Sequence, residues 1–201
     1  MFSADLAIPA LFVAVFSYLA GSVSAAIIVC RLMGLDDPRT AGSGNPGATN
    51  VLRLGGKLPA ALTLLGDALK GFLPVVVTAA LTSHPPTIAL AALAAFIGHL
   101  YPVFFQFEGG KGVATALGAL LGIDLSVGAL ALLTWLAVSL AFKRSSLAAL
   151  ITFVLVPLYL LFEAQQAFAF VFLIIGVFLF YTHRSNIQRL IAGTEPKIGK
   201  R

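Results

Sequence analysis

The chain has 201 residues, of which 59% are hydrophobic and only 10% are charged, and its formal net charge is +5. A soluble domain carries about 25% charged residues, so this composition excludes an ordinary soluble protein and predicts a polytopic membrane protein. The length allows one compact bundle, a single domain over residues 1–201. The one cysteine, Cys30, excludes an intramolecular disulfide. The sequence has no cluster of His and Cys that suits a metal, so no metal or other cofactor is expected.

Seven apolar runs follow one another along the chain. They are Leu6–Val29, Leu58–Thr82, Thr87–Phe107, Val113–Ile123, Leu125–Phe142, Leu147–Phe162 and Phe168–Thr182. A hydrocarbon core of about 30 Å needs about 20 apolar helical residues, and the fourth run supplies only about half of that. We expect this short segment to be tilted or sheltered by its neighbours. The first run has no cationic segment before it, which predicts a retained span rather than a cleaved signal peptide.

The distribution of Lys and Arg predicts the topology. If all seven runs cross the membrane, with the N-terminus outside and the C-terminus inside, 12 of the 13 Lys and Arg residues are cytoplasmic and the remaining one, Lys70, lies within a span. Cytoplasmic loops of membrane proteins carry such an excess of positive charge. Merging the fourth and fifth runs into one span would place Lys143 and Arg144, or the C-terminal tail, outside. The sequence therefore predicts an all-α integral membrane protein with seven transmembrane helices.

The first cytoplasmic loop contains the stretch Gly42–Arg53, which reads GSGNPGATNVLR. Turn-forming residues dominate it, so one interpretation is a plain connector. However, Asn50 and Arg53 lie three residues apart and share a face if a short helix follows. The planar guanidinium of Arg53 suits phosphate oxygens, and Ser43 can donate a further hydrogen bond. This pattern favours a polar binding site over a plain loop.

The second and third runs carry the ionisable groups that lie within the apolar part of the chain. Asp67 and Lys70 are three residues apart, and charges inside a membrane usually face the protein interior and pair. Mutual pairing is the simpler interpretation, and we favour a role in which the pair also braces a cytoplasmic cavity from behind. His99 lies near the end of the third run, where a lone histidine is more often a satisfied core group than a catalyst. Pro102 is expected to kink this helix.

The segment Phe107–Thr115, FEGGKGVAT, has three glycines around one lysine. Glycine lets the backbone approach a ligand closely, and successive N–H groups in such a loop can form an anion-binding nest. If a helix starts at Gly112, its unpaired N–H groups point to the same place, and Lys111 adds a positive charge. The alternative is a loop whose lysine only marks the cytoplasmic side. The segment is not a Walker A loop, because Phe105 stands where that motif has its first glycine.

The C-terminal tail, His183–Arg201, is polar and basic. His183 and Asn186 fall at helical spacing on one face. Basic residues in a tail bind lipid phosphates in the simplest interpretation. Glu195 is the single acidic residue among these cations and is able to orient one of them or accept a hydrogen bond from a substrate hydroxyl.

Together, the motifs Gly42–Arg53, Gly98–Thr115 and His183–Glu195 resemble the bacterial acyl-phosphate:glycerol-3-phosphate acyltransferase family, PlsY. The resemblance covers the motif order, the spacing and the apolar runs between the motifs. It implies an enzyme of the bacterial inner membrane with seven helices and a cytoplasmic active site. The implied reaction transfers a fatty acyl group from acyl phosphate to the 1-hydroxyl of sn-glycerol 3-phosphate, giving lysophosphatidate and phosphate in the first acylation of phospholipid biosynthesis. The implied partners are these two substrates and membrane lipids, with no nucleic acid.

The resemblance also implies which residues form the site. The predicted catalytic residues are Ser43, Arg53, Lys111, His183, Asn186 and Glu195. The predicted substrate-binding residues are Gly44, Asn45, Thr49, Asn50, Asp67, Lys70, His99, Gly109, Gly110, Gly112 and Thr115. Lys111 and the glycine-loop amides are expected to bind a phosphate, that of the acyl donor. The general base is either His183, whose ordinary pKa is near neutral, or a phosphate oxygen of the substrate.

Other classes of protein are less consistent with these residues. No histidine is followed five residues later by aspartate, which excludes the His-x4-Asp acyltransferases, and no serine or cysteine stands in a nucleophile elbow. A small transporter of phosphate or organic anions is the competing hypothesis, but transporters commonly show internal repeats and sites at the membrane midplane. A purely structural subunit would not need three polar motifs on one face.

Overall fold

The apolar runs form helices because a backbone inside hydrocarbon must satisfy its own hydrogen bonds, and an α-helix does so within one segment. The computed structural model describes residues 4–198, and the regular elements in that part are all helical. The elements are α1 (Ala4–Gly21), α2 (Ala25–Leu32), α3 (Ala48–Gly55), α4 (Lys57–Leu81), α5 (Pro85–Leu100), the 3-10 turn η1 (Val103–Phe105), α6 (Val113–Ile123), α7 (Leu125–Phe142), α8 (Ser145–Phe162), α9 (Gln166–Thr182) and α10 (Arg184–Ile191).

Five helical segments of residues 4–198 are long and apolar enough to cross a membrane: Pro9–Leu32, Lys57–Leu81, Pro85–Phe105, Leu125–Phe142 and Ser145–Phe162. The number rises to six if α9 and α10, which are bent by 63° at their junction, count as one span. The short apolar helix α6 matches the half-length fourth run. Each of the seven predicted runs thus contains a helix, while a total of seven crossings stays a prediction.

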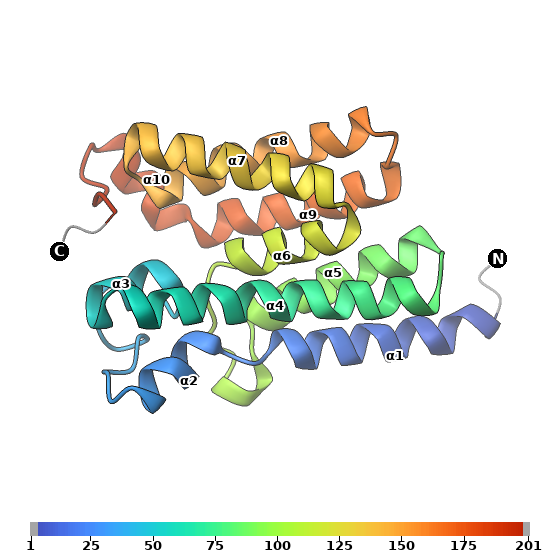
Figure 1. The fold of residues 1–201 in the computed structure, drawn as a ribbon, viewed down its shortest axis with the longest axis horizontal. Coiled ribbons are helices and arrows are strands. Elements are labelled where there is room, and N and C mark those ends of the chain that lie inside the picture. The colour runs from blue at the N-terminus through green and yellow to red at the C-terminus, as the bar shows by residue number, and fades with distance from the viewer. Residues whose placement is uncertain (1–3, 199–201) are drawn as a thin grey trace.

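The helices lie side by side along the long axis of the molecule (Figure 1). Helix α6 occupies the centre and packs mainly against α4, while α1 packs against α5 and α8 contacts both α7 and α9. The buried core includes Phe96 of α5, Leu120 of α6, Phe153 of α8 and Phe172 of α9. Helix α1 begins at one end of the long axis, and α2, α3 and α10 gather at the opposite end. We call this opposite end the polar end.

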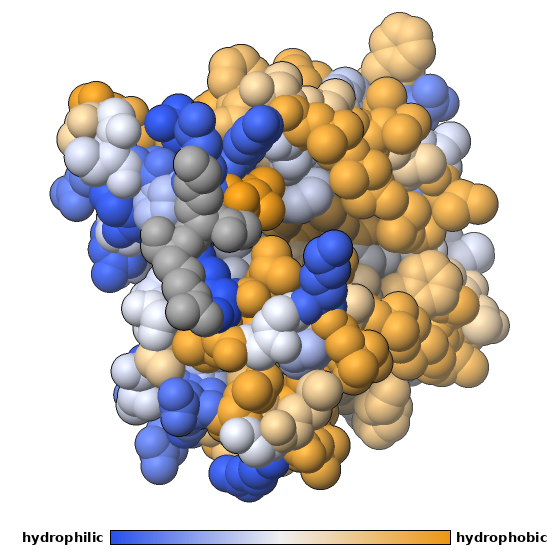
Figure 2. All heavy atoms as spheres, turned by 60° about the vertical axis from the view of Figure 1, so that its left-hand side comes forward, coloured by the Kyte–Doolittle hydropathy of each residue, from blue (hydrophilic) through white to orange (hydrophobic). Residues whose placement is uncertain are grey.

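Hydrophilic side chains gather on the polar end, which is turned forward in Figure 2, and hydrophobic side chains cover much of the remaining visible surface. Large apolar side chains on the body of the bundle are exposed, including Leu133 at 62% and Leu140 at 76%. A soluble protein would bury such residues, whereas a surface in contact with lipid does not need to. The surface therefore agrees with an integral membrane protein.

Two predicted spans are interrupted. The first run breaks at residues 22–24, between α1 and α2, and the ammonium of Lys70 donates to the carbonyl of Val23 there, at 2.8 Å. The third run was expected to be one helix kinked at Pro102, but α5 ends at Leu100 and η1 begins at Val103. The cause is that proline disfavours the helical conformation at the residue before it, and Tyr101 has φ −128° and ψ 68°.

Close backbone packing of α1 on α5 depends on Gly98. A Cβ at this position would lie 2.2 Å from the carbonyl oxygen of Tyr18. We expect Gly98→Ala to lower the free energy of unfolding by about 1–3 kcal/mol, because the backbone of α1 has to shift. Gly176→Ala on α9 is the matched control, since its Cβ would lie 3.3 Å from its nearest neighbour, the Phe153 oxygen. Thermal unfolding in detergent, followed by circular dichroism, measures the difference; equal losses in the two variants would contradict it.

Candidate active site

A cavity of about 1090 Å³ lies at the polar end, where α3, α4, α6, α7, α8 and α10 come together. Its polar lining includes Ser43, Arg53, Lys111, Ser146, His183, Asn186, Arg189 and Glu195. Its apolar lining includes Leu52, Leu64, Leu117, Leu132, Trp135 and Leu136. Such a cavity fits a molecule that has an anionic group joined to an apolar part.

Most of the predicted site residues line this cavity. They are Ser43, Asn45, Thr49, Asn50, Arg53, Asp67, His99, Lys111, Gly112, His183, Asn186 and Glu195. Gly109 and Gly110 instead line a neighbouring pocket of about 350 Å³. Gly44, Lys70 and Thr115 line neither of the two. Thr115 is fully buried in α6, so the structure gives it a packing position rather than a binding one.

The glycine loop ends at the N-terminus of α6. Gly112 is the N-cap residue, with φ 86°, and Val113 and Ala114 follow it along the cavity wall. The first N–H groups of a helix have no partner within the helix, so this wall presents donors to an anion. The amide of Gly110 behaves differently, because it donates to the carbonyl of His99 at 3.2 Å. Only the last part of the loop therefore leaves N–H groups free for an anion, and the whole predicted nest does not.

Gly110 is required by packing. A Cβ at this position would lie 2.3 Å from Nε2 of His99 and 2.9 Å from the carbonyl oxygen of Pro46. The loop thus lies directly against the end of α5 and against the first polar loop. Gly110 therefore allows two segments of the chain to pack closely, whereas the sequence suggested that it allows a ligand to approach.

Lys111 is the central cation of the site. Its ammonium donates to Oδ1 of Asn186. Burial, together with the positive charges of Arg189 and Arg53, lowers the pKa of Lys111 to about 8, and the charge of Glu195 opposes this change. A bound anion would favour the charged form, so the local electrostatics suit a phosphate or sulfate group.

Glu195 holds the C-terminal segment against α8 and α10. Its Oε1 accepts hydrogen bonds from Ser146 Oγ and Asn186 Nδ2, both at 2.6 Å, and its Oε2 accepts one from Arg189 Nε at 2.7 Å. Burial alone would raise the pKa of Glu195, but these three donors lower it below the ordinary value. Glu195 therefore stays charged and orients Asn186 toward Lys111.

Sequence reasoning missed two members of this cluster. Ser146 had no signal, because it is separated from Glu195 by 49 residues and lies at the start of an apolar helix. Arg189 is one of the tail cations whose simplest interpretation is binding of lipid phosphates. The isolation of Glu195 left open whether it orients one of these cations or accepts from a substrate hydroxyl, and the structure pairs it with Arg189.

His183 lies at the bend between α9 and α10 and is buried. Its Nδ1 donates to the carbonyl of Leu179 at 2.8 Å, which leaves Nε2 with a free lone pair. Burial, followed by the charge of Lys111, lowers the pKa of His183 to about 4. The ring is therefore neutral at neutral pH and is a hydrogen-bond acceptor at Nε2.

The amide of Asn50 is used to fold the first loop. Its Oδ1 accepts from the backbone N–H of Ser43 at 2.8 Å, and its Nδ2 donates to the carbonyls of Pro38 and Ala41 at 2.9 and 3.0 Å. With its donors occupied, Asn50 positions Ser43 rather than offering hydrogen bonds to a ligand. Arg53, one turn further on in α3, lines the cavity as expected.

Asp67 and Lys70 form a buried ion pair within α4. Oδ1 of Asp67 lies 2.9 Å from Nζ of Lys70 and 3.6 Å from Nδ1 of His99 on α5. Asp67 and His99 line the cavity, whereas Lys70 turns toward the break before α2. The pair therefore connects the cavity wall at Asp67 to the break between α1 and α2, and its bracing role stays a prediction.

Apolar helices around a cavity with a cationic end define an integral membrane protein whose cavity suits an amphipathic, anionic molecule. The sequence profile described as glycerol-3-phosphate acyltransferase matches residues 11–193. The glycerol-3-phosphate acyltransferase of Methylococcus capsulatus is 55% identical over 92% of this chain and 93% of that protein. The one of Francisella tularensis subsp. novicida is 49% identical over 92% of this chain and 91% of its own length.

Solved structures agree with this match. The crystal structure of PlsY (YgiH), an integral membrane glycerol 3-phosphate acyltransferase, in its glycerol 3-phosphate form has a TM-score of 0.90 and 39% identity, over 94% of this chain and 96% of that one. The lysophosphatidic acid form has a TM-score of 0.89 and 38% identity, over 94% and 95%. The chain belongs to the glycerol-3-phosphate acyltransferase family, in its PlsY branch, which confirms the resemblance carried by the three motifs. It is an acyltransferase of phospholipid biosynthesis.

The lowered pKa of Lys111 predicts how anion binding depends on pH. Sulfate does not titrate near neutral pH, so its affinity is expected to fall as pH rises through about 8, where Lys111 loses its proton. In Lys111→Arg the affinity should stay level to above pH 10, since arginine keeps its charge. Trp135, the single tryptophan, lines the cavity, and its fluorescence measures binding. The same pH midpoint in both proteins would exclude Lys111 as the titrating group.

Proposed function

We propose that this enzyme transfers a fatty acyl group from acyl phosphate to the 1-hydroxyl of sn-glycerol 3-phosphate, giving 1-acyl-sn-glycerol 3-phosphate and inorganic phosphate. The observation that carries the proposal is one cavity with a cationic end at Arg53, Lys111 and Arg189 and an apolar wall of leucines. The two PlsY structures described as glycerol 3-phosphate and lysophosphatidic acid forms support the acceptor and the product. Acyl phosphate is the proposed donor because its phosphate group suits the same cations as the phosphate of glycerol 3-phosphate.

The proposed topology has seven crossings, with the N-terminus outside, the C-terminus in the cytoplasm and the active site on the cytoplasmic face of the bacterial inner membrane. An odd number of crossings is supported by the positions of α1 and α10, since α1 begins at one end of the bundle and α10 lies at the other. Cations of the polar end, among them Arg31, Arg53 and Arg189, give the proposed cytoplasmic face its positive charge. The whole chain acts as one unit, with lipid around its body.

The proposed roles follow the geometry. Lys111 and the free N–H groups at the start of α6 bind the phosphate of the acyl donor. Arg53 and Ser43 bind glycerol 3-phosphate or share the donor, while His183 and Asn186 orient the acceptor. The leucine wall holds the acyl chain, so the carbonyl carbon lies at the border between the apolar and the cationic parts. Positioning and charge stabilisation supply most of the rate, because acyl phosphate has a good leaving group.

In the chemical step, the 1-hydroxyl oxygen bonds to the acyl carbon, the bond from that carbon to the phosphate oxygen breaks, and phosphate leaves. The hydroxyl proton needs an acceptor. With a pKa of about 4, His183 is a weaker base than a phosphomonoester, whose second pKa is about 6. We therefore assign the proton of the 1-hydroxyl to a phosphate oxygen of the substrate. Nε2 of His183 accepts a hydrogen bond from the 2-hydroxyl of glycerol 3-phosphate and so orients the acceptor.

The acyl donor distinguishes this proposal from acyl transfer that uses acyl-CoA. Purified protein in detergent is expected to form lysophosphatidate and phosphate in equal amounts from acyl phosphate and glycerol 3-phosphate, and to form none from acyl-CoA. Mass spectrometry of the lipid and a colorimetric phosphate assay measure both products. Lys111→Ala should abolish turnover, whereas Lys143→Ala, which changes an exposed lysine at the same end, should not. Comparable turnover with acyl-CoA would overturn the donor assignment, and anion uptake into liposomes without any acyl transfer would favour a transporter.

His183→Gln separates the two candidate bases. If a phosphate oxygen takes the proton, this variant is expected to lose less than about hundredfold in kcat/KM, because only orientation is weakened. The fall of activity on the acid side, near pH 6, should persist, since it belongs to the substrate phosphate. A steady-state pH profile of both proteins measures this. A loss of a thousandfold or more, together with a profile that no longer falls near pH 6, would restore His183 as the base.

A further inference from the structure

The segment before the glycine loop is held in a strained conformation. Gln106 and Phe107 are consecutive non-glycine residues with φ 59° and 61°. This left-handed region is unfavourable for L-residues, and two in succession persist only where surrounding contacts hold them. Lys111 follows four residues later, so whatever holds this segment also affects the position of the central cation.

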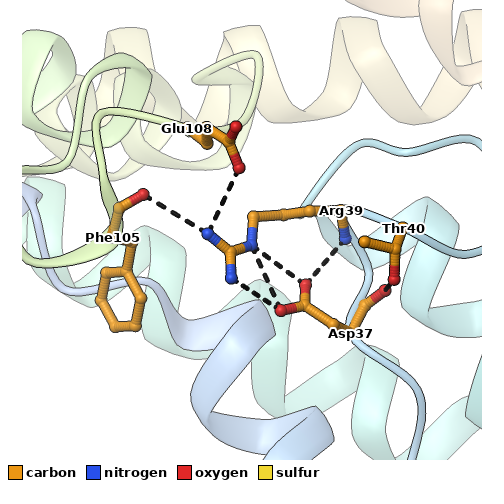
Figure 3. Close-up of polar contacts among 5 residues, drawn as sticks. All are labelled: Asp37, Arg39, Thr40, Phe105 and Glu108. Carbon is orange, nitrogen blue, oxygen red and sulfur yellow. Dashed lines mark hydrogen bonds and ion pairs between the residues drawn. The ribbon is translucent and has the colours of Figure 1, made fainter.

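Backbone hydrogen bonds within the segment, from Phe107 to Pro102 and from Glu108 to Phe105, provide part of these contacts. One arginine from the first loop provides contacts from outside the segment (Figure 3). On one side, Nε and Nη2 of Arg39 donate to the carboxylate of Asp37, at 3.1 and 2.8 Å. On the other side, Nη1 donates to the carbonyl of Phe105 at 3.5 Å and to Oε2 of Glu108 at 3.3 Å. The two acceptors enclose the strained pair, and they lie 66 and 69 residues away from Arg39 in sequence.

The Asp37 carboxylate fixes the direction of the guanidinium. It also accepts the backbone N–H of Arg39 at 2.9 Å, and the hydrogen bonds from Arg39 lower the pKa of Asp37, so it stays charged. The side chain of Arg39 is only 22% exposed. Arginine suits this position because its planar fork serves several acceptors at once, which the single ammonium of lysine cannot reproduce.

The first loop and the glycine loop are joined at a second place besides Arg39. The two loops meet again where Gly110 lies against the carbonyl of Pro46. Ser43 lies between Arg39 and this point on the first loop, and Lys111 directly follows Gly110 on the second. Two points of contact fix the relative placement of these two walls, although Arg39 itself lines neither cavity.

We propose that Arg39 is a positioning residue for the acyl transfer: it joins the first loop to the strained segment and so keeps Lys111 buried beside Arg53. Its importance for turnover rests on the proposed function, whereas its effect on the placement of Lys111 does not. Without this contact the segment relaxes, and Lys111 becomes more exposed to water.

The test compares Arg39→Gln, Glu108→Ala and Arg31→Gln. Arg31 is an exposed cation of α2 and serves as the matched control. Arg39→Gln is expected to lower kcat/KM on the order of tenfold and Glu108→Ala by less, while Arg31→Gln stays within about twofold. A loss of folded protein would lower activity as well, so a second measurement is needed that reports only on Lys111.

That measurement is the pH at which sulfate binding is lost, followed by Trp135 fluorescence. In the unchanged protein Lys111 faces Arg53 of α3, Arg189 of α10 and Glu195, and its burial places the midpoint near pH 8. Relaxation of the loop exposes Lys111 and moves the midpoint to higher pH in both Arg39→Gln and Glu108→Ala. A purely electrostatic effect on the pKa of Lys111 would have opposite signs in the two variants. Arg39→Gln removes a cation and would raise the pKa, whereas Glu108→Ala removes an anion and would lower it.

An upward shift in both variants, absent in Arg31→Gln, is the expected result. An unchanged midpoint in both, or shifts of opposite sign, would overturn the positioning role. If the unchanged protein forms no lysophosphatidate from acyl phosphate, the proposed function fails, and the sulfate midpoint still decides the role of Arg39.

Discussion

A charge at the edge of a hydrocarbon bundle needs a partner, and this requirement organises the polar end of the molecule. Asp67 pairs with Lys70, and Glu195 pairs with Arg189, each at less than 3 Å. Lys111 differs, because within residues 4–198 it makes no ion pair and its close partner is the neutral amide of Asn186. Burial without a paired carboxylate lowers the pKa of Lys111 and leaves a buried cation that suits an anion from outside the chain.

The neutral partner of Lys111 is itself held in place. Asn186 uses its Nδ2 to donate to Glu195, so its Oδ1 is directed to the lysine. A carboxylate at position 186 would neutralise Lys111 and compete with a substrate phosphate, whereas an amide fixes the ammonium without cancelling its charge. Glu195 meanwhile has its charge satisfied by Arg189, Ser146 and Asn186. The cluster thus separates the positive charge of Lys111, which we propose binds substrate, from the negative charge of Glu195, which holds the scaffold.

Local and periodic features were predictable from the sequence. Each of the seven apolar runs contains a helix, although the first and third are interrupted, and α6 begins after Gly112 as expected. His183 and Asn186 lie at one bend because their spacing is helical. What the sequence could not show were contacts between distant segments. Asn50 carries donors suited to phosphate, but its neighbours in space are carbonyls of its own loop. Ser146 and Arg39 act on partners 49 and 69 residues away, and no periodic pattern reports such pairs.

The half-length α6 gives the cavity its depth. Helices α6 and α7 share a turn at Asp124, where the carboxylate accepts from the N–H groups of Ser126 and Val127 and caps α7. From this common point α6 extends 11 residues toward the polar end and α7 extends 18. At 1.5 Å per residue, α6 therefore stops about 10 Å short of α7. The N-terminus of α6, with Lys111 beside it, is recessed below the rim formed by its neighbours. A phosphate bound there would lie level with the upper part of the leucine wall, so an acyl chain attached to it enters apolar surroundings directly. The segment that is too short to span a membrane is thus the one whose shortness brings the proposed phosphate site down to the proposed place of the acyl chain.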